Sequence, residues 1–287
     1  MRETMTERTF FLGLGGQKCG SSWYQAYLAR QPGSDFGRLG EYQVWEADLG
    51  GVFARYRVPP PSRAERVRAR AKTLLGAAEP ASHLRWRLQS DREAYFDYFE
   101  RLLDQPGVVR TGDVTPSYAA LPAETLARIR DGFDKRGIAV KAIFAMRDPV
   151  ARLMSHLEME IAKGRIPDTS RPEALLAFHD TEEARARSRY DKTLDALEAV
   201  FAPSERHVCL FEEMLTPAGV TALAQFAGVP VDTARASDKV NARGGGRDLP
   251  EDVIRTVARS YAPVFAAVLN RLPQATEFWP SLPYATD

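Results

Sequence analysis

The sequence predicts an α/β fold in which a central parallel β-sheet is flanked by helices. Four short apolar runs, rich in β-branched and aromatic residues, indicate buried strands at residues 9–14, 108–112, 140–146 and 207–211. Helical patterns lie between these runs, and such alternation is typical of parallel sheets, because each crossover between strands carries a covering helix. The length of 287 residues suits one large α/β domain, or one domain with an appended lobe.

Capping residues and apolar stripes mark the helices between the strands. Asp148 and Pro149 form an N-cap and first turn, and a helix that opens at Thr216 is closed by Gly228. A last helix starts at Pro250. Apolar stripes mark two helices, through Val150, Leu153, Leu157 and Ile161 in one and Tyr190, Leu194, Leu197 and Phe201 in the other. Pro263 is expected to kink or end the last helix, and a fifth strand is expected near residues 34–38.

Bulk composition excludes several classes of protein. Hydrophobic residues make up 44% of the chain, which is enough for a sizeable core, and the formal net charge of +1 gives no general attraction for nucleic acid or for a membrane. No apolar run approaches the ~20 residues of a membrane span, and the N-terminal residues lack the apolar region of a signal peptide. Cys19 and Cys209 do not indicate a disulfide framework, so a cytoplasmic location is expected.

Residues 51–90 depart from the alternation of strands and helices. They contain the run VPPPS, which is followed by basic residues at Arg63, Arg66, Arg68, Arg70 and Lys72. One interpretation is a lid or a substrate-facing insertion. The other is a solvated basic helix, whose charge Glu65 partly offsets. The sequence leaves both interpretations open.

Residues 13–22, GLGGQKCGSS, connect the first strand to the first helix. A dinucleotide-binding fingerprint requires Gly where this chain has Lys18, and a Walker A loop requires Lys where it has Ser21. A tight structural turn is one remaining interpretation. The other is an anion site, in which Lys18, the amides of Gly20, Ser21 and Ser22 at a helix N-terminus, and the two hydroxyls hold a phosphate. Such a site suits a 5′-phosphate that carries a further negative group.

The stretch QKCGSSW resembles the 5′-phosphosulfate loop of sulfotransferases that use 3′-phosphoadenosine 5′-phosphosulfate (PAPS). A second match is FAMRDPVARLMSH, which places Arg147 at a strand end and Ser155 eight residues later, on the following helix. In this family an Arg and a Ser at this spacing hold the 3′-phosphate of the cofactor, because a guanidinium offers fork-like donors to phosphate. For Arg147 alone, a surface salt bridge is the alternative.

Two later segments also resemble this family. The run TPSY at residues 115–118 matches a family segment, although Asp113 and Val114 stand where the family has a Glu-Lys pair. Tyr190 and the acidic pair at residues 212–213 fall where the family has a Tyr-bearing helix, a strand and an acidic turn. For Tyr190 and the acidic pair, a purely structural role is the alternative.

The resemblance extends from Phe10 to about Pro250. Arg243 and Arg247 lie in the place of a Gly- and Arg-containing loop that closes on the 3′-phosphate, and an exposed flexible loop is the alternative. The resemblance implies a P-loop-like, three-layer fold and a single domain over residues 1–287. The match is weakest over residues 47–106, which are expected to be a helical insertion or an acceptor-side lid.

The resemblance further implies transfer of a sulfuryl group from PAPS to a hydroxyl of a carbohydrate or another small-molecule acceptor, with no metal ion. Lys18 is the residue expected to stabilise the charge that develops on the leaving oxygen. The acceptor hydroxyl needs a base. Glu41, in GRLGEYQVW, stands where heparan-type carbohydrate sulfotransferases carry their base, although Gly40 replaces the usual Lys. Asp113 is the second candidate for the base and His83 the third.

The expected site therefore binds a nucleotide and involves neither nucleic acid nor membrane insertion. Its cofactor-binding residues are expected to be Gln17, Lys18, Cys19, Gly20, Ser21, Ser22, Arg147, Ser155, Tyr190, Arg243 and Arg247. A P-loop kinase or another phosphoryl-transfer enzyme is the alternative function, in which KAIFAMRD is a Walker B strand and Asp148 holds magnesium. A nucleotide-binding protein that has the clamp but lacks a base is a third possibility.

Overall fold

The computed structural model describes residues 7–234 and 249–286, and its centre is a sheet of parallel strands. The strands are β1 (Thr9–Gly13), β2 (Arg110–Val114), β3 (Ala139–Met146) and β4 (Arg206–Leu210), in the spatial order β2-β1-β3-β4. β1 pairs along its whole length with β2 on one side and β3 on the other. The strands coincide with the four apolar runs, so the predicted central parallel sheet is confirmed.

The strand expected near residues 34–38 was wrong. Only Ser34 takes part in sheet pairing there, through an isolated bridge to Arg110. The flanking glycines explain the difference, because Gly33 and Gly37 have φ angles of 76° and 68°. Positive φ turns the chain away from an extended conformation, and the segment therefore leaves the sheet edge after one residue.

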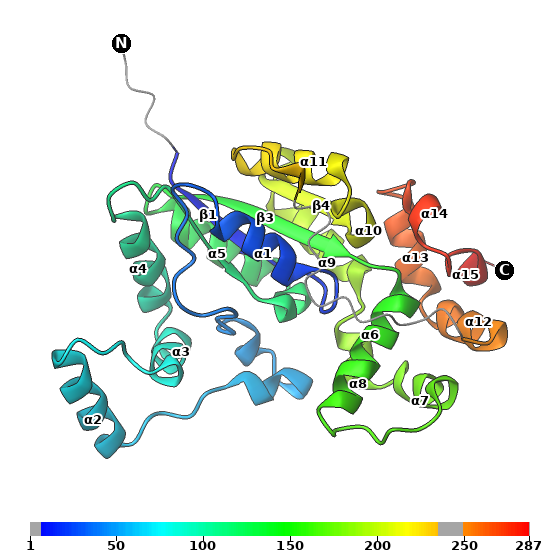
Figure 1. Cartoon of the computed structure of the whole chain (residues 1–287), viewed down its shortest axis with the longest axis horizontal. Coiled ribbons are helices and arrows are strands. Elements are labelled where there is room, and N and C mark those ends of the chain that lie inside the picture. The colour runs from blue at the N-terminus through cyan, green and yellow to red at the C-terminus, as the bar shows by residue number, and fades with distance from the viewer. Residues whose placement is uncertain (1–6, 235–248, 287) are drawn as a thin grey trace, which may run out of the picture.

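Helices cover both faces of the sheet. In Figure 1, α1 (Ser21–Ala29) lies in front of the strands, whereas α5 (Ala123–Asp134) and α9 (Tyr190–Val200) lie behind them and pack against each other. At the two edges, α4 (Arg92–Leu103) packs against β2 and α11 (Pro217–Ala227) against β4. In this three-layer arrangement, the loops that join strands to helices lie at the two ends of the sheet.

Eight more of the described helices follow β3 in the chain, and α6 is the longest of them. They are α6 (Pro149–Ala162), α7 (Arg171–Phe178), α8 (Glu182–Ala186), α10 (Phe211–Met214), α12 (Glu251–Ser260), α13 (Ala262–Leu269), α14 (Ala275–Phe278) and α15 (Pro283–Thr286). The predicted cap residues act as expected: Asp148 caps α6, and Gly228 ends α11 with a φ of 63°. Pro263 separates α12 from α13, as predicted. Within the described ranges, no helix is long and apolar enough to cross a bilayer.

An aromatic cluster joins β1 to the helices behind it. The ring of Phe10 stacks on Phe133 of α5, with centroids 4.0 Å apart, and meets the edges of Tyr95 and Phe99 of α4. All four side chains are buried. Aromatic pairs of this kind add about 0.5–1.5 kcal/mol each beyond burial of their area. α4 is therefore part of the core, although it lies within the weakly matching residues 47–106.

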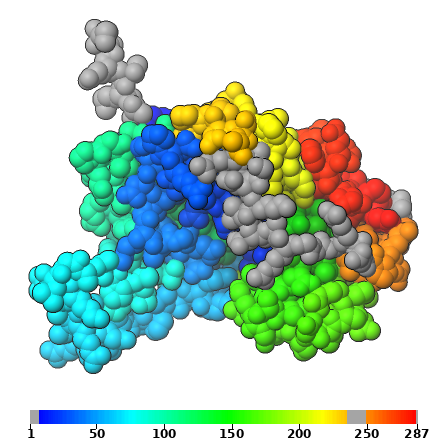
Figure 2. Space-filling model, in the orientation of Figure 1, coloured from blue at the N-terminus to red at the C-terminus, as the bar shows by residue number. Residues whose placement is uncertain are grey.

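The rest of residues 47–106 is helical and less tightly packed. It contains η2 (Gly51–Tyr56), α2 (Arg63–Leu74) and α3 (Ala81–Ser90), after the short η1 (Glu46–Asp48). α2 begins with a capping box but buries none of its residues. Figure 2 shows α2 and α3 as a lobe that projects from the body of the molecule. The basic residues at positions 63–72 thus lie on a largely solvated helix.

Candidate functional site

The loop between β1 and α1 has an unusual backbone conformation. Lys18 and Gly20 have φ angles of 72° and 85°, and Gly20 is the N-cap of α1. A Cβ at Gly20 would lie 2.7 Å from Phe211 and 2.8 Å from Met214, so no larger residue fits there. Positive φ is rare for Lys and costs about 1–3 kcal/mol, and such strain is concentrated at functional sites.

Backbone hydrogen bonds hold this loop on the carboxyl end of the sheet. The amides of Leu14 and Gly16 donate to the carbonyls of Ile143 and Ala145, at 2.9 and 3.1 Å, which continues the pairing with β3 beyond the end of β1. The loop therefore lies in the crevice where open α/β sheets bind their ligands.

The start of α1 is available for an anion. No side chain of the described residues caps this helix at Gly20. The first amides of a helix have no intrahelical acceptor and carry partial positive charge, which makes them an anion site. Ser22 is exposed, whereas Gln17, Lys18 and Gly20 are half-buried and Ser21 is nearly buried. The predicted loop residues thus surround the helix end.

Arg147, at the end of β3, lies beside this loop. Its guanidinium is 5.1 Å from the centre of the Phe211 ring, the same ring that closes off Gly20. Arg147 Nε is 4.0 Å from Glu212 Oε1, and it has no hydrogen-bond partner among the described residues. The guanidinium therefore retains donor capacity at the edge of the site.

Burial raises the pKa of Glu212 to about 7, although the positive charge of Arg147 acts in the opposite direction. Trp279 Nε1 donates to the second oxygen of Glu212 at 3.3 Å. Glu212 thus stands between the core and the Arg147 guanidinium. The sequence singled it out only as part of an acidic pair for which a structural role was the alternative.

Tyr190 connects the loop to the end of β3. Its hydroxyl donates to the Arg147 carbonyl at 3.1 Å, and its oxygen is in hydrogen-bond contact with Cys19 Sγ at 3.4 Å. Burial raises the pKa of Cys19 to about 11, which keeps the thiol protonated. Tyr190 is 1% exposed. Cys19 and Tyr190 therefore position the loop relative to Arg147.

Asp148 has its oxygens occupied by protein groups. It accepts the amides of Val150 and Ala151 as the cap of α6. The backbone amide of Ser281 donates to it at 3.0 Å, and the Ser281 hydroxyl at 2.6 Å. A Walker B carboxylate must face a metal ion at the site. The buried Asp148 instead fixes the start of the helix that carries Ser155, which is half-buried.

Asp113, the second predicted base, is completely buried at the end of β2. It accepts hydrogen bonds from the hydroxyls of Thr115 and Tyr118, both at 2.7 Å, and of Tyr95 at 3.1 Å. Burial raises its pKa to about 6, while these hydroxyls favour the ionised form. The carboxylate is thus enclosed by its own donors.

Thr115 connects Asp113 to the backbone next to the predicted base Glu41. The Thr115 hydroxyl oxygen accepts the amides of Tyr42 and Gln43, at 3.1 and 3.3 Å. The Arg85 guanidinium donates to the carbonyls of Glu41 and Tyr42, at 2.8 and 2.9 Å. The backbone that carries Glu41 is therefore held from both sides.

The Glu41 side chain is exposed at the surface of this segment. It accepts a hydrogen bond from Gln43 Nε2 at 3.1 Å. Partial desolvation raises its pKa, while Gln43 and the positive charges of Arg85 and Lys163 act in the opposite direction. A solvent-accessible carboxylate with a raised pKa is suited to accept a proton. The role of Glu41 as the base stays a prediction.

A third carboxylate, Glu46, was not predicted. It is 0% exposed, and its Oε1 accepts a hydrogen bond from the Ser117 hydroxyl at 2.6 Å. Its Oε2 is buried with no hydrogen-bond partner among the described residues. Burial raises the pKa of Glu46 to about 7. Glu46 belongs to no motif in the sequence, so only the three-dimensional contact with Ser117 identifies it as a candidate site residue.

A basic cluster on α6 was also not predicted. Arg152 and His156 are 0% exposed, and two guanidinium nitrogens of Arg152 and both ring nitrogens of His156 lack hydrogen-bond partners among the described residues. His156 Nε2 lies 3.7 Å from Glu183, yet burial and the charge of Arg152 hold its pKa far below the usual range. Arg152 also acts to lower the pKa of Cys19. His156 is therefore neutral, and of the two only Arg152 adds positive charge near the loop.

The structure does not bring every predicted residue to the loop. Arg243 and Arg247 lie outside the described residues. His83 lies on α3 and lines a groove of about 570 Å³ between α2 and α3, together with Arg66, Arg70 and Trp86. Glu41 is connected to the sheet through Thr115. Contacts among the described residues join the loop, Arg147, Tyr190 and Glu212 in one continuous group.

The fold is similar to that of a sulfotransferase from Alicyclobacillus acidocaldarius, with a TM-score of 0.59, 19% identity, and coverage of 93% of this chain and 96% of that one. Sulfotransferase domains from the curacin biosynthetic pathway (TM-score 0.44, 15% identity, 84% of this chain and 81% of that one) and from a Synechococcus olefin synthase (TM-score 0.44, 16% identity, 91% and 98%) are also similar. The first of these similarities establishes a P-loop-like α/β fold. No protein-family model and no curated protein matches the chain.

Proposed function

We propose that this protein is a sulfotransferase that moves a sulfuryl group from PAPS to a hydroxyl of a carbohydrate or another small-molecule acceptor. The observation that carries the proposal is that the start of α1, which no side chain of the described residues caps, and the Arg147 guanidinium both adjoin the Phe211 ring. The two cationic sites suit a ligand with anionic groups at both its 5′ and 3′ positions. In this proposal, residues 1–287 are one domain, and residues 47–106 are a helical insertion or an acceptor-side lid, of which α4 packs into the core.

The residues around the loop fit the donor. The amides of Gly20, Ser21 and Ser22 and the two serine hydroxyls would hold its 5′ group, and Gln17 borders the same loop. Arg147, whose Nε has no hydrogen-bond partner among the described residues, and Ser155 would hold its 3′-phosphate. When bound, PAPS supplies an activated sulfuryl group. Cys19 and Tyr190 would act indirectly, because their hydrogen bonds fix the loop relative to Arg147.

Lys18 would provide the main electrostatic stabilisation. Lys18 belongs to the loop at the end of the sheet, and its ammonium group would act where negative charge grows on the leaving oxygen. The strained φ of 72° holds its backbone in a conformation that the fold must impose. The buried Arg152 adds positive charge from beneath the loop.

Glu41 would accept the proton of the acceptor hydroxyl. The exposed position and raised pKa of its carboxylate support this role. Asp113 is less suited to be the base, because three hydroxyls already donate to it and its exposed fraction is 0%. In this proposal Asp113 instead positions Glu41 through Thr115.

Phosphoryl transfer is the other function considered for a loop of this kind. Asp148 would have to hold magnesium, but its oxygens are used to cap α6 and to bind Ser281. Ser21 also occupies the place of the Walker A lysine. Both observations favour sulfuryl transfer.

Ligand-dependent melting tests the proposal first. We expect 3′-phosphoadenosine 5′-phosphate (PAP) at 100 times its dissociation constant to stabilise the folded protein by about 2.7 kcal/mol. AMP, or ATP with magnesium, should stabilise it less at the same concentration. Equal stabilisation by PAP and AMP would remove the case for a 3′-phosphate clamp. Release of PAP from PAPS in the presence of a panel of alcohols then separates an enzyme from a binding protein.

A further inference from the structure

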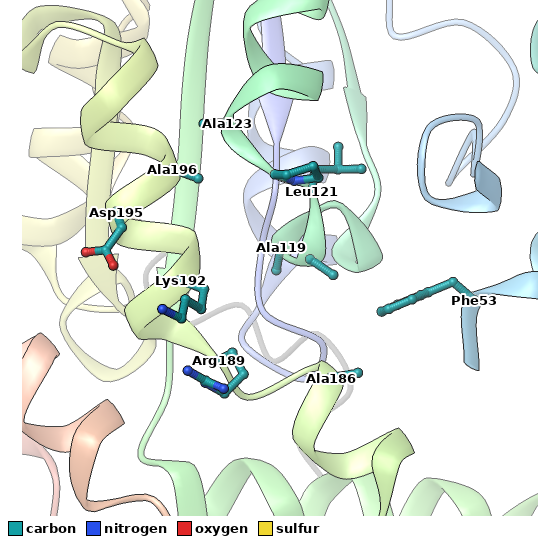
Figure 3. Close-up of a pocket in the computed structure, with 11 residues that line it drawn as sticks. Phe53, Ala119, Leu121, Ala123, Ala186, Arg189, Lys192, Asp195 and Ala196 are labelled. Carbon is teal, nitrogen blue, oxygen red and sulfur yellow. The ribbon is translucent and has the colours of Figure 1, made fainter. Parts of the chain in front are cut away.

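A cavity of about 550 Å³ lies between η2, η3 (Pro116–Ala120) and α9, and the proposed reaction does not use it. Its wall is mostly apolar and consists of Phe53, Ala119, Ala120, Leu121, Pro122, Ala123, Ala186 and Ala196, with Arg189, Lys192 and Asp195. Figure 3 shows the Phe53 ring on one side of the space and the α9 residues on the other. The volume lies within the ~300–1,000 Å³ of small-molecule sites.

Two of the three charged side chains in this wall are held in salt bridges. The Arg189 guanidinium is bound to the Asp191 carboxylate at 2.6 Å, and Asp195 is bound by Arg271 at 2.9 Å. Lys192 is exposed and forms no salt bridge with any residue that the structure describes. It does influence Asp191, but that carboxylate already accepts three contacts from Arg189. Arg271 also binds Glu198, at 2.8 Å, so the cations and carboxylates around the wall balance in number, and Lys192 is the cation of the wall that no salt bridge within the described residues occupies.

The walls are fixed before any ligand arrives. The Thr193 hydroxyl donates to the Ala119 carbonyl at 2.6 Å, which fastens α9 to η3. On the opposite side, Phe53 lies 5.1 Å beneath the Arg187 guanidinium, which Glu183 holds at 2.7 Å. Phe53 is 6% exposed and so has little freedom to move. A preformed pocket loses little binding free energy to ordering.

We propose that this pocket binds a compact aromatic or aliphatic molecule that carries one anionic group. The apolar part would lie against Phe53 and Leu121, where the five alanines leave room for a ring. The anionic group would lie at Lys192, which can make a charge-assisted hydrogen bond. None of the lining residues belongs to the proposed donor site, although Arg189 directly precedes Tyr190 in the chain. The site is thus independent of PAPS binding.

Calorimetric titration with 2-naphthoate and with its neutral counterpart 2-naphthamide tests this proposal. We expect one 2-naphthoate to bind per chain, with an affinity about 3- to 10-fold above that of the amide, the scale of one exposed charged hydrogen bond. Lys192→Met should lower the affinity for 2-naphthoate to that of the amide and leave amide binding unchanged. Ala123→Leu, which fills the pocket beside α5, should abolish binding of both probes.

Lys135→Met is the matched control, because Lys135 is also exposed but lies outside the pocket. It should bind both probes like the wild type. Failure of 2-naphthoate to bind, equal affinity for both probes, or unchanged binding by Lys192→Met would each overturn the proposal. The Lys192→Met comparison decides the matter even if Ala123→Leu fails to fold. If the wild-type protein binds 2-naphthoate but does not bind PAP, the proposed donor site is contradicted and the pocket proposal is not.

Discussion

Replacement of Arg147 by Ala should separate ligand binding from folding. In the structure the guanidinium contributes a cation–π contact with Phe211 at 5.1 Å and a loose approach of 4.0 Å to Glu212. The first is worth about 0.5–1 kcal/mol and the second at most about 1 kcal/mol. We therefore expect Arg147→Ala to lower the free energy of unfolding by only ~0.5–2 kcal/mol.

The loss of ligand affinity should be larger. A phosphate held by charged hydrogen bonds gains about 1.5–3 kcal/mol, which corresponds to roughly 10- to 150-fold in the dissociation constant of PAP. AMP lacks the 3′-phosphate, so its affinity should stay unchanged. Arg147→Lys should recover only part of the loss, because an ammonium group cannot reproduce the fork of donors.

Calorimetric titration of PAP and AMP, together with chemical denaturation, measures both effects. Arg30→Ala serves as the control, since Arg30 is exposed at the far end of α1. The assignment is refuted by a folded Arg147→Ala protein that binds PAP as tightly as the wild type. It is equally refuted if AMP loses as much affinity as PAP, because the guanidinium would then act on the nucleotide without regard to its 3′-phosphate.

Four further outcomes are expected. Lys18→Met should lower turnover about 100- to 1,000-fold in a PAP-release assay, the effect of losing one oxyanion donor. Glu41→Gln should lower turnover about 100- to 10,000-fold while PAP still binds in titration. Asp113→Asn should reduce stability to denaturant by about 1–3 kcal/mol, because buried hydroxyls lose a charged acceptor. The folded state raises the pKa of Glu212 to about 7 from a usual 4.5, so the folded protein binds more protons between these values and its stability falls as pH rises through them. Glu212→Gln should therefore flatten the dependence of the melting temperature on pH in this window.

The strands were predictable because each overlaps a short apolar run, although β2 and β4 lie at the edges of the sheet. β3, for example, buries Ala142 through Met146 without interruption, and such runs stand out from the amphipathic helices around them. The prediction at residues 34–38 failed because pattern alone did not reveal the positive φ of Gly33 and Gly37.

The sequence predicted the position of a candidate site residue only where that residue directly follows a strand, because the strand then determines where the residue lies. A loop that leaves β1 and enters α1 must lie at the carboxyl end of the sheet, and Arg147 follows the neighbouring strand. The contact of Tyr190 with Cys19 joins residues 171 positions apart, and no local pattern encodes it. Glu46 and Arg152 were not predicted from the sequence for the same reason. They stand out because they are buried with unpartnered polar atoms, and burial depends on the tertiary structure.

The departure of this chain from the Glu-Lys pattern at positions 113–114 has a packing explanation. Val114 is 1% exposed, and its side chain fills the space beside Gly13, where an added Cβ would lie only 2.8 Å from it. A lysine at position 114 would bury its charge in this contact, at a cost of several kcal/mol. If Glu41 is the base, as proposed, the positive charge near it must come from elsewhere, and Arg85 and Lys163 are the cations that act on Glu41. The missing lysine is therefore compatible with a carboxylate base, provided that these two residues supply the charge in its place.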